Sequence, residues 1–172
     1  MAATAYEDRP GYVQTKDVLF RIKRGLVSYV SYLAACEMNQ AFSEYVLYEP
    51  ILRILMACGF QVACEVECPG IEQAPIGDRK RLGFVAHNDE IEFALEVKWI
   101  KKPKMSVARD IEKLQAYIRE RPDSLGLICL FGKQSVHQQV QAASWPVLAP
   151  SEPHRCRAHQ HEIRVPDLPA AR

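Results

Sequence analysis

The chain has 172 residues, of which 48% are hydrophobic and 25% are charged, a composition typical of a soluble globular protein with one domain. Its 22 basic and 21 acidic residues give a formal charge of +1, which excludes strong attraction of a polyanion by the protein as a whole. No run reaches roughly 18 apolar residues, so the sequence predicts no membrane-spanning helix and no membrane partner. Any binding of nucleic acid therefore has to come from local clusters of charge.

The N-terminal segment and the cysteines indicate the compartment. Residues 1–14 are mostly small and polar, which predicts a disordered segment without the basic and apolar regions of a secretory signal. The six cysteines lie mostly within apolar segments, which favours reduced and buried thiols over disulfides. Together these features predict a cytoplasmic protein.

Two helices are predicted in the first third of the chain. Apolar residues recur at helical spacing from Thr15 to about Glu37, which predicts one long amphipathic helix. A second helix is predicted from Ser43 to Gly59, a glycine that suits a C-terminal cap. Pro50 lies within this segment and either kinks the helix or marks its first turn.

After the second helix, the pattern changes from helical spacing to alternation. Strands are predicted at residues 60–68 and 79–87, and a turn signal after the second of them predicts a hairpin with a third strand at 90–99. In the third strand the odd-numbered residues are apolar and share one face. Glu96 and Lys98 therefore lie side by side on the other face.

The second half of the chain predicts a helix and then a buried strand. Helical spacing runs over residues 107–121, and the continuous apolar run at 125–131 is typical of a central strand covered on both faces. A short helix is predicted at residues 134–144. The order of elements predicts one α/β domain over residues 15–150, with a mixed central β-sheet flanked by helices, followed by an edge strand or tail at 151–172.

The pair Glu96 and Lys98 suits metal-assisted hydrolysis of a phosphodiester. A carboxylate and the adjacent backbone carbonyl of Val97 offer the hard oxygen ligands that Mg²⁺ prefers. The lysine can orient or deprotonate a water molecule and offset charge that develops on the phosphate. This chemistry also requires a second acid, from the neighbouring strand of the hairpin.

From about Ser43 to Phe131 the chain resembles the PD-(D/E)XK phosphodiesterase superfamily, which includes many restriction and repair nucleases. The resemblance rests on a helix with a glutamate, the hairpin RLGFVAHNDEIEFALEVKW, the helix RDIEKLQAYI and the strand LGLICLF, in this order. Glu96-Val97-Lys98 corresponds to the E-x-K half of the motif. The resemblance implies a restriction-endonuclease-like core and a nuclease that acts on DNA or RNA with Mg²⁺ or Mn²⁺. No glycine-rich phosphate-binding loop is present, so no nucleotide cofactor is expected.

The resemblance also implies roles for individual residues. Catalysis would fall to Glu96 and Lys98, with Glu44 or Glu49 as support from the preceding helix. Asp110 and Lys113 fall in the helix after the hairpin, where such proteins often carry polar residues beside the site. The implied metal ligands are Glu96, the Val97 carbonyl and Asp78, and the implied substrate contacts are Lys101, Lys102, Lys113 and Gln115.

One position departs from the superfamily pattern. An aspartate is expected on the first strand of the hairpin, and Gly83 stands there, although glycine weakens a strand. Three explanations are open. An acid from elsewhere substitutes, with Asp78, Glu65 and Glu67 as the candidates; the protein is a degenerate member that binds without cutting; or the change was introduced to silence an active enzyme.

The alternatives to a nuclease come from different classes of protein. A degenerate member would act as a module that binds nucleic acid or another protein. A homodimer or larger homo-oligomer, formed through the sheet edge or the long first helix, is a third alternative. The lysine cluster after the third strand is either a solvated edge or a phosphate contact. A zinc site is disfavoured because paired Cys-x-x-Cys spacing is missing among the C-terminal candidates His154, Cys156, His159 and His161.

Overall fold

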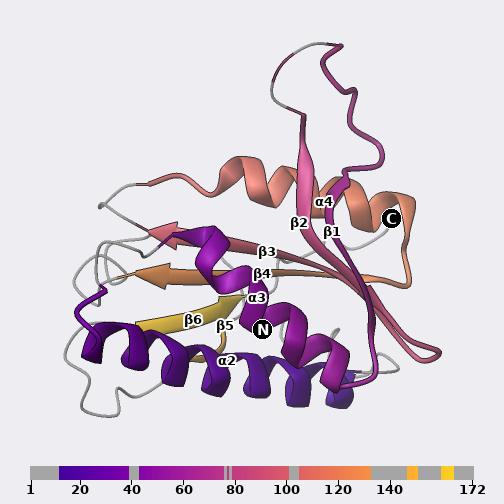
Figure 1. Cartoon of the computed structure of the whole chain (residues 1–172). Helices are drawn as coiled ribbons and strands as arrows, with labels where there is room; N and C mark the ends of the chain where they lie inside the picture. Colours follow the sequence, from indigo (N-terminus) through magenta and orange to yellow (C-terminus); the bar gives the residue numbers. More distant parts are fainter. Residues whose placement is uncertain are drawn as a thin grey trace.

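The computed structural model describes residues 12–38, 43–75, 77, 79–100, 105–132, 147–150 and 160–164. Of the helices within these ranges, none combines the length and apolar character that a membrane span requires. The elements, shown in Figure 1, are α2 (Tyr12–Ala35), α3 (Glu44–Ala57), β1 (Gln61–Glu67), β2 (Arg81–His87), β3 (Glu92–Ile100), α4 (Ala108–Glu120), β4 (Leu125–Gly132), β5 (Val147–Pro150) and β6 (Gln160–Arg164).

The strands form one mixed sheet in the order β1-β2-β3-β4-β6-β5. The strands β1, β2 and β3 form an antiparallel meander, whereas β3 and β4 are parallel and are connected through α4. A parallel pair needs such a crossover, because the chain has to return to the same end of the sheet. The predicted α/β class, with a mixed sheet flanked by helices, is confirmed.

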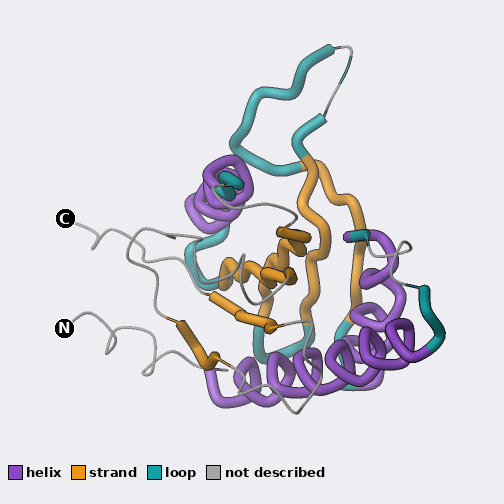
Figure 2. The backbone as a smooth tube through the Cα atoms, turned by 90° about the vertical axis from the view of Figure 1, so that its left-hand side faces the viewer, coloured by secondary structure: helices purple, strands orange, loops and turns teal. Residues whose placement is uncertain are grey.

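The two faces of the sheet are covered by different helices (Figure 2). On one face, α2 and α3 pack over a core that includes Leu95, Val97 and Phe131. On the other face, α4 packs over a second core that includes Ala94 and Ile128. Alternation along β3 therefore sends its odd-numbered side chains toward α2 and α3 and its even-numbered side chains toward α4.

Some predicted boundaries differ from the structure. The helix α2 already begins at Tyr12, so the end of the predicted disordered segment is helical, and residues 1–11 lie outside the described residues. Pro50 lies inside α3, beyond its first turn. The predicted helix at 134–144 also lies outside the described residues. Within the predicted C-terminal segment, β6 pairs with both β4 and β5, so it is not an edge strand.

Tight packing of α4 on β4 generates a prediction. A Cβ atom at Gly126 would lie 2.7 Å from Ile118 Cδ1 and 3.2 Å from Leu114 Cβ. Because Leu114 Cβ is fixed to the helix backbone, Gly126→Ala has to push α4 away from the sheet. We expect Gly126→Ala to lower the free energy of unfolding by about 1–3 kcal/mol, measured by urea unfolding followed by circular dichroism.

The matched control is Gly25→Ala in α2. A Cβ atom there would lie 2.6 Å from Ile54 Cδ1, the far end of a side chain that can rotate away. Alanine also gains about 1 kcal/mol of helix propensity over glycine, so this variant is expected to lose less stability than Gly126→Ala. An equal loss in the two variants would contradict the tight contact between α4 and β4.

Candidate functional site

The site begins on β3, at the residues that alternation turns toward α4. Leu95 and Val97 are buried under α2 and α3, and Glu96 and Lys98 lie on the opposite face, as predicted. Glu96 is only 5% exposed. The ladder between β2 and β3 runs only as far as the pair Phe84↔Leu95, so Glu96 is the first residue of β3 beyond this pairing.

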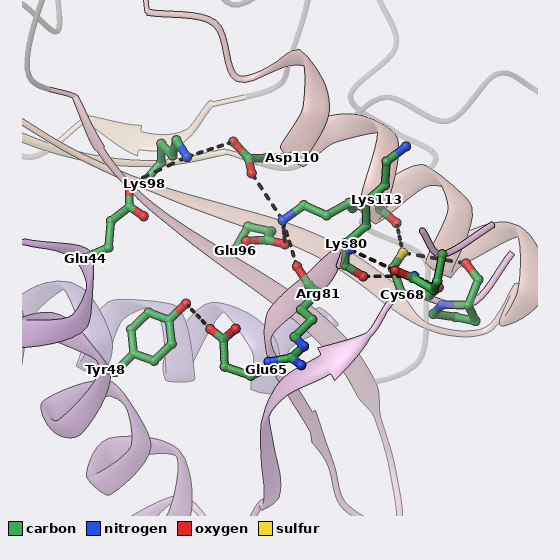
Figure 3. A network of polar contacts seen from close by, with 12 residues as sticks. Glu44, Tyr48, Glu65, Cys68, Lys80, Arg81, Glu96, Lys98, Asp110 and Lys113 are labelled. Atoms are coloured by element: carbon green, nitrogen blue, oxygen red, sulfur yellow. Dashed lines mark hydrogen bonds and ion pairs between the residues drawn. The ribbon is translucent and has the colours of Figure 1, made fainter. Parts of the chain in front are cut away.

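Lys113 of α4 reaches over the sheet to Glu96 (Figure 3). Its Nζ lies 2.5 Å from Glu96 Oε1 and 3.3 Å from Asp110 Oδ1, one turn earlier on the same helix. The same Nζ donates a hydrogen bond to the backbone carbonyl of Arg81 at 2.8 Å. With its side chain only 14% exposed, the ammonium joins β2, β3 and α4 at one point.

The electrostatics of this pair follow from its burial. Burial raises the pKa of Glu96 to about 7, while Lys113 and Lys98 act to lower it and Asp110 acts to raise it. For Lys113, burial acts to lower the pKa, but the attraction of Glu96 and Asp110 is stronger, so its pKa is raised. Lys113 therefore stays charged, whereas Glu96 titrates close to neutrality.

Glu44 and Lys98 extend the cluster toward α3. Lys98 Nζ lies 3.7 Å from Glu44 Oε1 and 3.6 Å from Asp110 Oδ2, and its side chain is 29% exposed. Glu44 Oε1 also accepts a hydrogen bond from the backbone N–H of Trp99 at 3.0 Å. Glu44 stands in the first turn of α3, where a negative charge is favoured by the helix dipole.

Gly83, where the resemblance implies an acid, lies on β2 beside β1. The pairs Cys64↔Phe84 and Val66↔Leu82 place Glu65 opposite Gly83 in the register of β1 and β2. Glu65 has a φ of 54°, in the left-handed region that side chains other than glycine rarely adopt. The backbone of β1 is therefore distorted directly across from Gly83.

Tyr48 of α3 lies next to Gly83 and Glu65 and occupies the space between α3 and the hairpin. Its hydroxyl donates a hydrogen bond to Glu65 Oε1 at 3.1 Å. A Cβ atom at Gly83 would lie 3.0 Å from Tyr48 Oη and 3.2 Å from the backbone oxygen of Leu95. Both contacts are tighter than is usual for Cβ atoms. An aspartate at position 83 would consequently require Tyr48 to move.

Tyr48 is a residue that the sequence analysis missed. Burial raises its pKa, and so do the carboxylates of Glu65, Glu96 and Glu44. Three carboxylates, from α3, β1 and β3, therefore act on the charge of one phenol, and Glu65 is in direct contact with it. The available signal was the spacing of Glu44 and Tyr48, because residues four apart lie on the same face of a helix.

The remaining predicted residues are distributed differently. Glu49 is outside the cluster, since it forms an ion pair with Arg53 on the exposed face of α3 and its side chain is 59% exposed. Lys113, predicted as a substrate contact, lies inside the cluster instead. Gln115 is half-buried on α4 and takes no part in these ion pairs.

Of the acids proposed as substitutes for the aspartate at position 83, Glu67 is exposed and pairs with Arg79. The predictions for Asp78, Lys101 and Lys102 lie outside the described residues.

The donor set does not fit a divalent metal ion in this arrangement. The residues that the structure describes contain no group of three or more His, Cys, Asp or Glu side chains placed to hold a metal ion. Each carboxylate near the site is engaged by a cation or a hydrogen-bond donor: Glu96 by Lys113, Glu44 by Lys98 and Trp99, and Glu65 by Tyr48. A metal ion would have to displace these partners.

Comparison with protein-family models, with curated proteins and with solved structures finds no match for this chain. What the site does has therefore to be inferred from its own residues and geometry.

The burial of Glu96 generates a prediction about pH. Because its pKa rises from 4.5 to about 7 on folding, the folded state holds this proton more tightly than the unfolded chain. The resulting stabilisation is complete below about pH 4.5 and is lost as the pH rises through about 7. We expect the free energy of unfolding of the wild type, minus that of Glu96→Gln, to fall by about 3 kcal/mol across this window. Urea unfolding at a series of pH values measures it.

Glu49→Gln is the control for this experiment, because it makes the same chemical change at an exposed glutamate of α3. If the pH-dependent difference at Glu96 were no larger than the difference at Glu49, the burial of the Glu96 carboxylate would be contradicted.

Proposed function

We propose that the chain is a nuclease-fold protein of the PD-(D/E)XK kind that binds nucleic acid without cleaving it. The observation that carries this proposal is Gly83: the strand position that should supply a metal-binding acid has no side chain, and Tyr48 fills the adjacent space. The one carboxylate of the E-x-K motif, Glu96, is at the same time neutralised by Lys113.

The arrangement of elements supports a restriction-endonuclease-like core. The order α3-β1-β2-β3-α4-β4, with an antiparallel meander followed by a parallel crossover, is the order that the sequence resemblance implies. Glu96 and Lys98 lie together on β3, where β2 stops pairing with it. Glu44 at the start of α3 and Asp110 on α4 approach the same point.

Basic side chains near the site support nucleic acid as the partner. Lys80, Lys113 and Arg119 all lie close enough to the Cys68 thiol to oppose the rise in its pKa that burial causes. Lys80 and Arg119 are exposed, and Lys98 is partly exposed. Lys101, Lys102 and Lys104 follow β3 directly in the sequence. Lysine and arginine side chains clustered in this way contact the phosphates of a nucleic acid whatever its base sequence.

A second candidate function is a metal-dependent nuclease in which Glu65 replaces the missing acid. The observation that favours it is the position of Glu65, directly opposite Gly83 and close to the same phenol as Glu96. Glu65, Glu96 and the Val97 carbonyl would then hold Mg²⁺ or Mn²⁺, which would polarise the phosphate. Lys113 would have to leave Glu96 for this arrangement to form.

A cleavage panel separates the two candidates. Single- and double-stranded DNA and RNA are incubated with Mg²⁺ or Mn²⁺ and the wild type, Gly83→Asp, Glu65→Gln or Lys98→Ala. We expect no cleavage by the wild type, because no acid stands at position 83. Cleavage by the wild type that both Glu65→Gln and Lys98→Ala abolish would overturn the proposal in favour of the second candidate.

Binding is tested by fluorescence polarisation of labelled DNA and RNA over a range of salt concentrations. We expect Lys101→Ala/Lys102→Ala to weaken binding and to reduce the slope of log K against log salt by about 2, since each phosphate contact contributes about 0.9. The matched control, Arg21→Ala/Arg24→Ala, removes two exposed charges from α2, on the other face of the sheet. Equal effects in both double variants, or no binding by the wild type, would contradict the proposed interface.

A further inference from the structure

Lys113 makes contacts that a bound cation would make. Its ammonium is surrounded by three oxygen atoms, from Glu96 of β3, Asp110 of α4 and the Arg81 carbonyl of β2. The contact with the Arg81 carbonyl is a hydrogen bond, and the contacts with the two carboxylates are ion pairs. Two carboxylates and one carbonyl are also the donor types that hard metal cations prefer.

The distances decide which cation this shell suits. The three N···O distances are 2.5, 3.3 and 2.8 Å. Charge-assisted hydrogen bonds of an ammonium are about 2.7–2.9 Å long, whereas Mg²⁺ requires oxygens at about 2.0–2.1 Å in a near-octahedral arrangement. All three distances exceed those that Mg²⁺ requires, and the contact with the Arg81 carbonyl lies within the ammonium range. The shell around Lys113 Nζ is therefore too wide for Mg²⁺.

The ammonium groups nearly balance the charge of the cluster without a metal ion. Glu44, Glu96 and Asp110 carry three negative charges when ionised, and Lys98 and Lys113 carry two positive charges. A divalent ion added beside both lysines would turn this net charge of −1 into +1, and an uncompensated charge is costly in a largely buried cluster. An aspartate at position 83 would supply the missing negative charge, and glycine does not.

We propose that the ammonium of Lys113 is the resident cation of this site and takes the place of a divalent metal ion. The absence of an acid at Gly83 and the presence of Lys113 are then two parts of one charge balance. The inference deepens the proposed function and rests on it for the expectation of a metal at Glu96. It further implies a latent metal site, which opens when the lysine is removed and the acid at position 83 is supplied.

The test counts bound Mn²⁺ directly. Loss of the free Mn²⁺ signal in electron paramagnetic resonance is measured for the wild type, Lys113→Ala, Lys113→Ala/Gly83→Asp and Lys98→Ala, together with the melting temperature in each titration. We expect no binding by the wild type at millimolar Mn²⁺. The double variant is expected to bind one ion at least tenfold more tightly than the wild type, with a rise of several degrees in melting temperature.

Lys98→Ala is the matched control, because it removes an ammonium that lies more than 3.5 Å from its carboxylates. Lys113→Gln, alone and with Gly83→Asp, keeps a donor for the Arg81 carbonyl and serves if the alanine variants do not fold. One Mn²⁺ bound by the wild type and lost in Glu96→Gln would overturn the inference. So would a gain of affinity in the Lys113 variants no larger than in Lys98→Ala.

Nucleic-acid binding is measured on the same samples by fluorescence polarisation. The two proposals can then fail separately. If the wild type binds both Mn²⁺ and nucleic acid, only the proposed role of Lys113 is overturned. If the wild type binds neither Mn²⁺ nor nucleic acid, only the proposed nucleic-acid binding is overturned.

Discussion

The contact between Lys113 and Glu96 is the interaction on which the arrangement of the site depends. The apolar odd-numbered residues of β3 fix which face of the strand enters the core under α2 and α3, and Glu96 is thereby turned under α4. A carboxylate that is 5% exposed is costly unless a partner compensates its charge. Lys113 provides that partner, and its bond to the Arg81 carbonyl also fixes the start of β2 to α4.

A second constraint acts on the opposite side of the hairpin. Glu65 adopts a left-handed backbone conformation, which costs about 1 kcal/mol or more for a residue other than glycine. The hydrogen bond from Tyr48 compensates part of this cost, and the Tyr48 ring packs against Phe84 in a tilted arrangement, with the ring centroids 4.6 Å apart. Strained backbone of this kind clusters at functional sites, which agrees with a functional role for this part of the sheet.

Much of this arrangement could be read from periodicity. Alternation in β3 correctly placed Glu96 and Lys98 on one face, because both cores are strongly apolar. The helix phase could also have separated the two glutamates of α3, since Glu44 lies one turn before the buried Leu47, whereas Glu49 does not share that face. The expectation of buried thiols was wrong for Cys64 of β1, which is exposed and lies next to the left-handed Glu65.

The contact between Lys113 and Glu96 could not be predicted from the sequence. The spacing of Lys113 to Asp110 is local, but its contact with Glu96 depends on how α4 crosses the sheet, which no local pattern specifies.

The closeness of Tyr48 to Gly83 has a consequence for the substitutions that the chain can accept. The side chain of an aspartate at position 83 would crowd the phenol of Tyr48 and the backbone oxygen of Leu95, so this change alone disturbs the packing. Loss of Lys113 alone leaves Glu96 buried without its partner. Each single change toward a metal site thus gives a less stable protein, and because both changes make the cluster more negative, they compensate each other only when a divalent cation binds. Selection against unstable intermediates would therefore oppose the conversion of this cluster into a metal site by single substitutions.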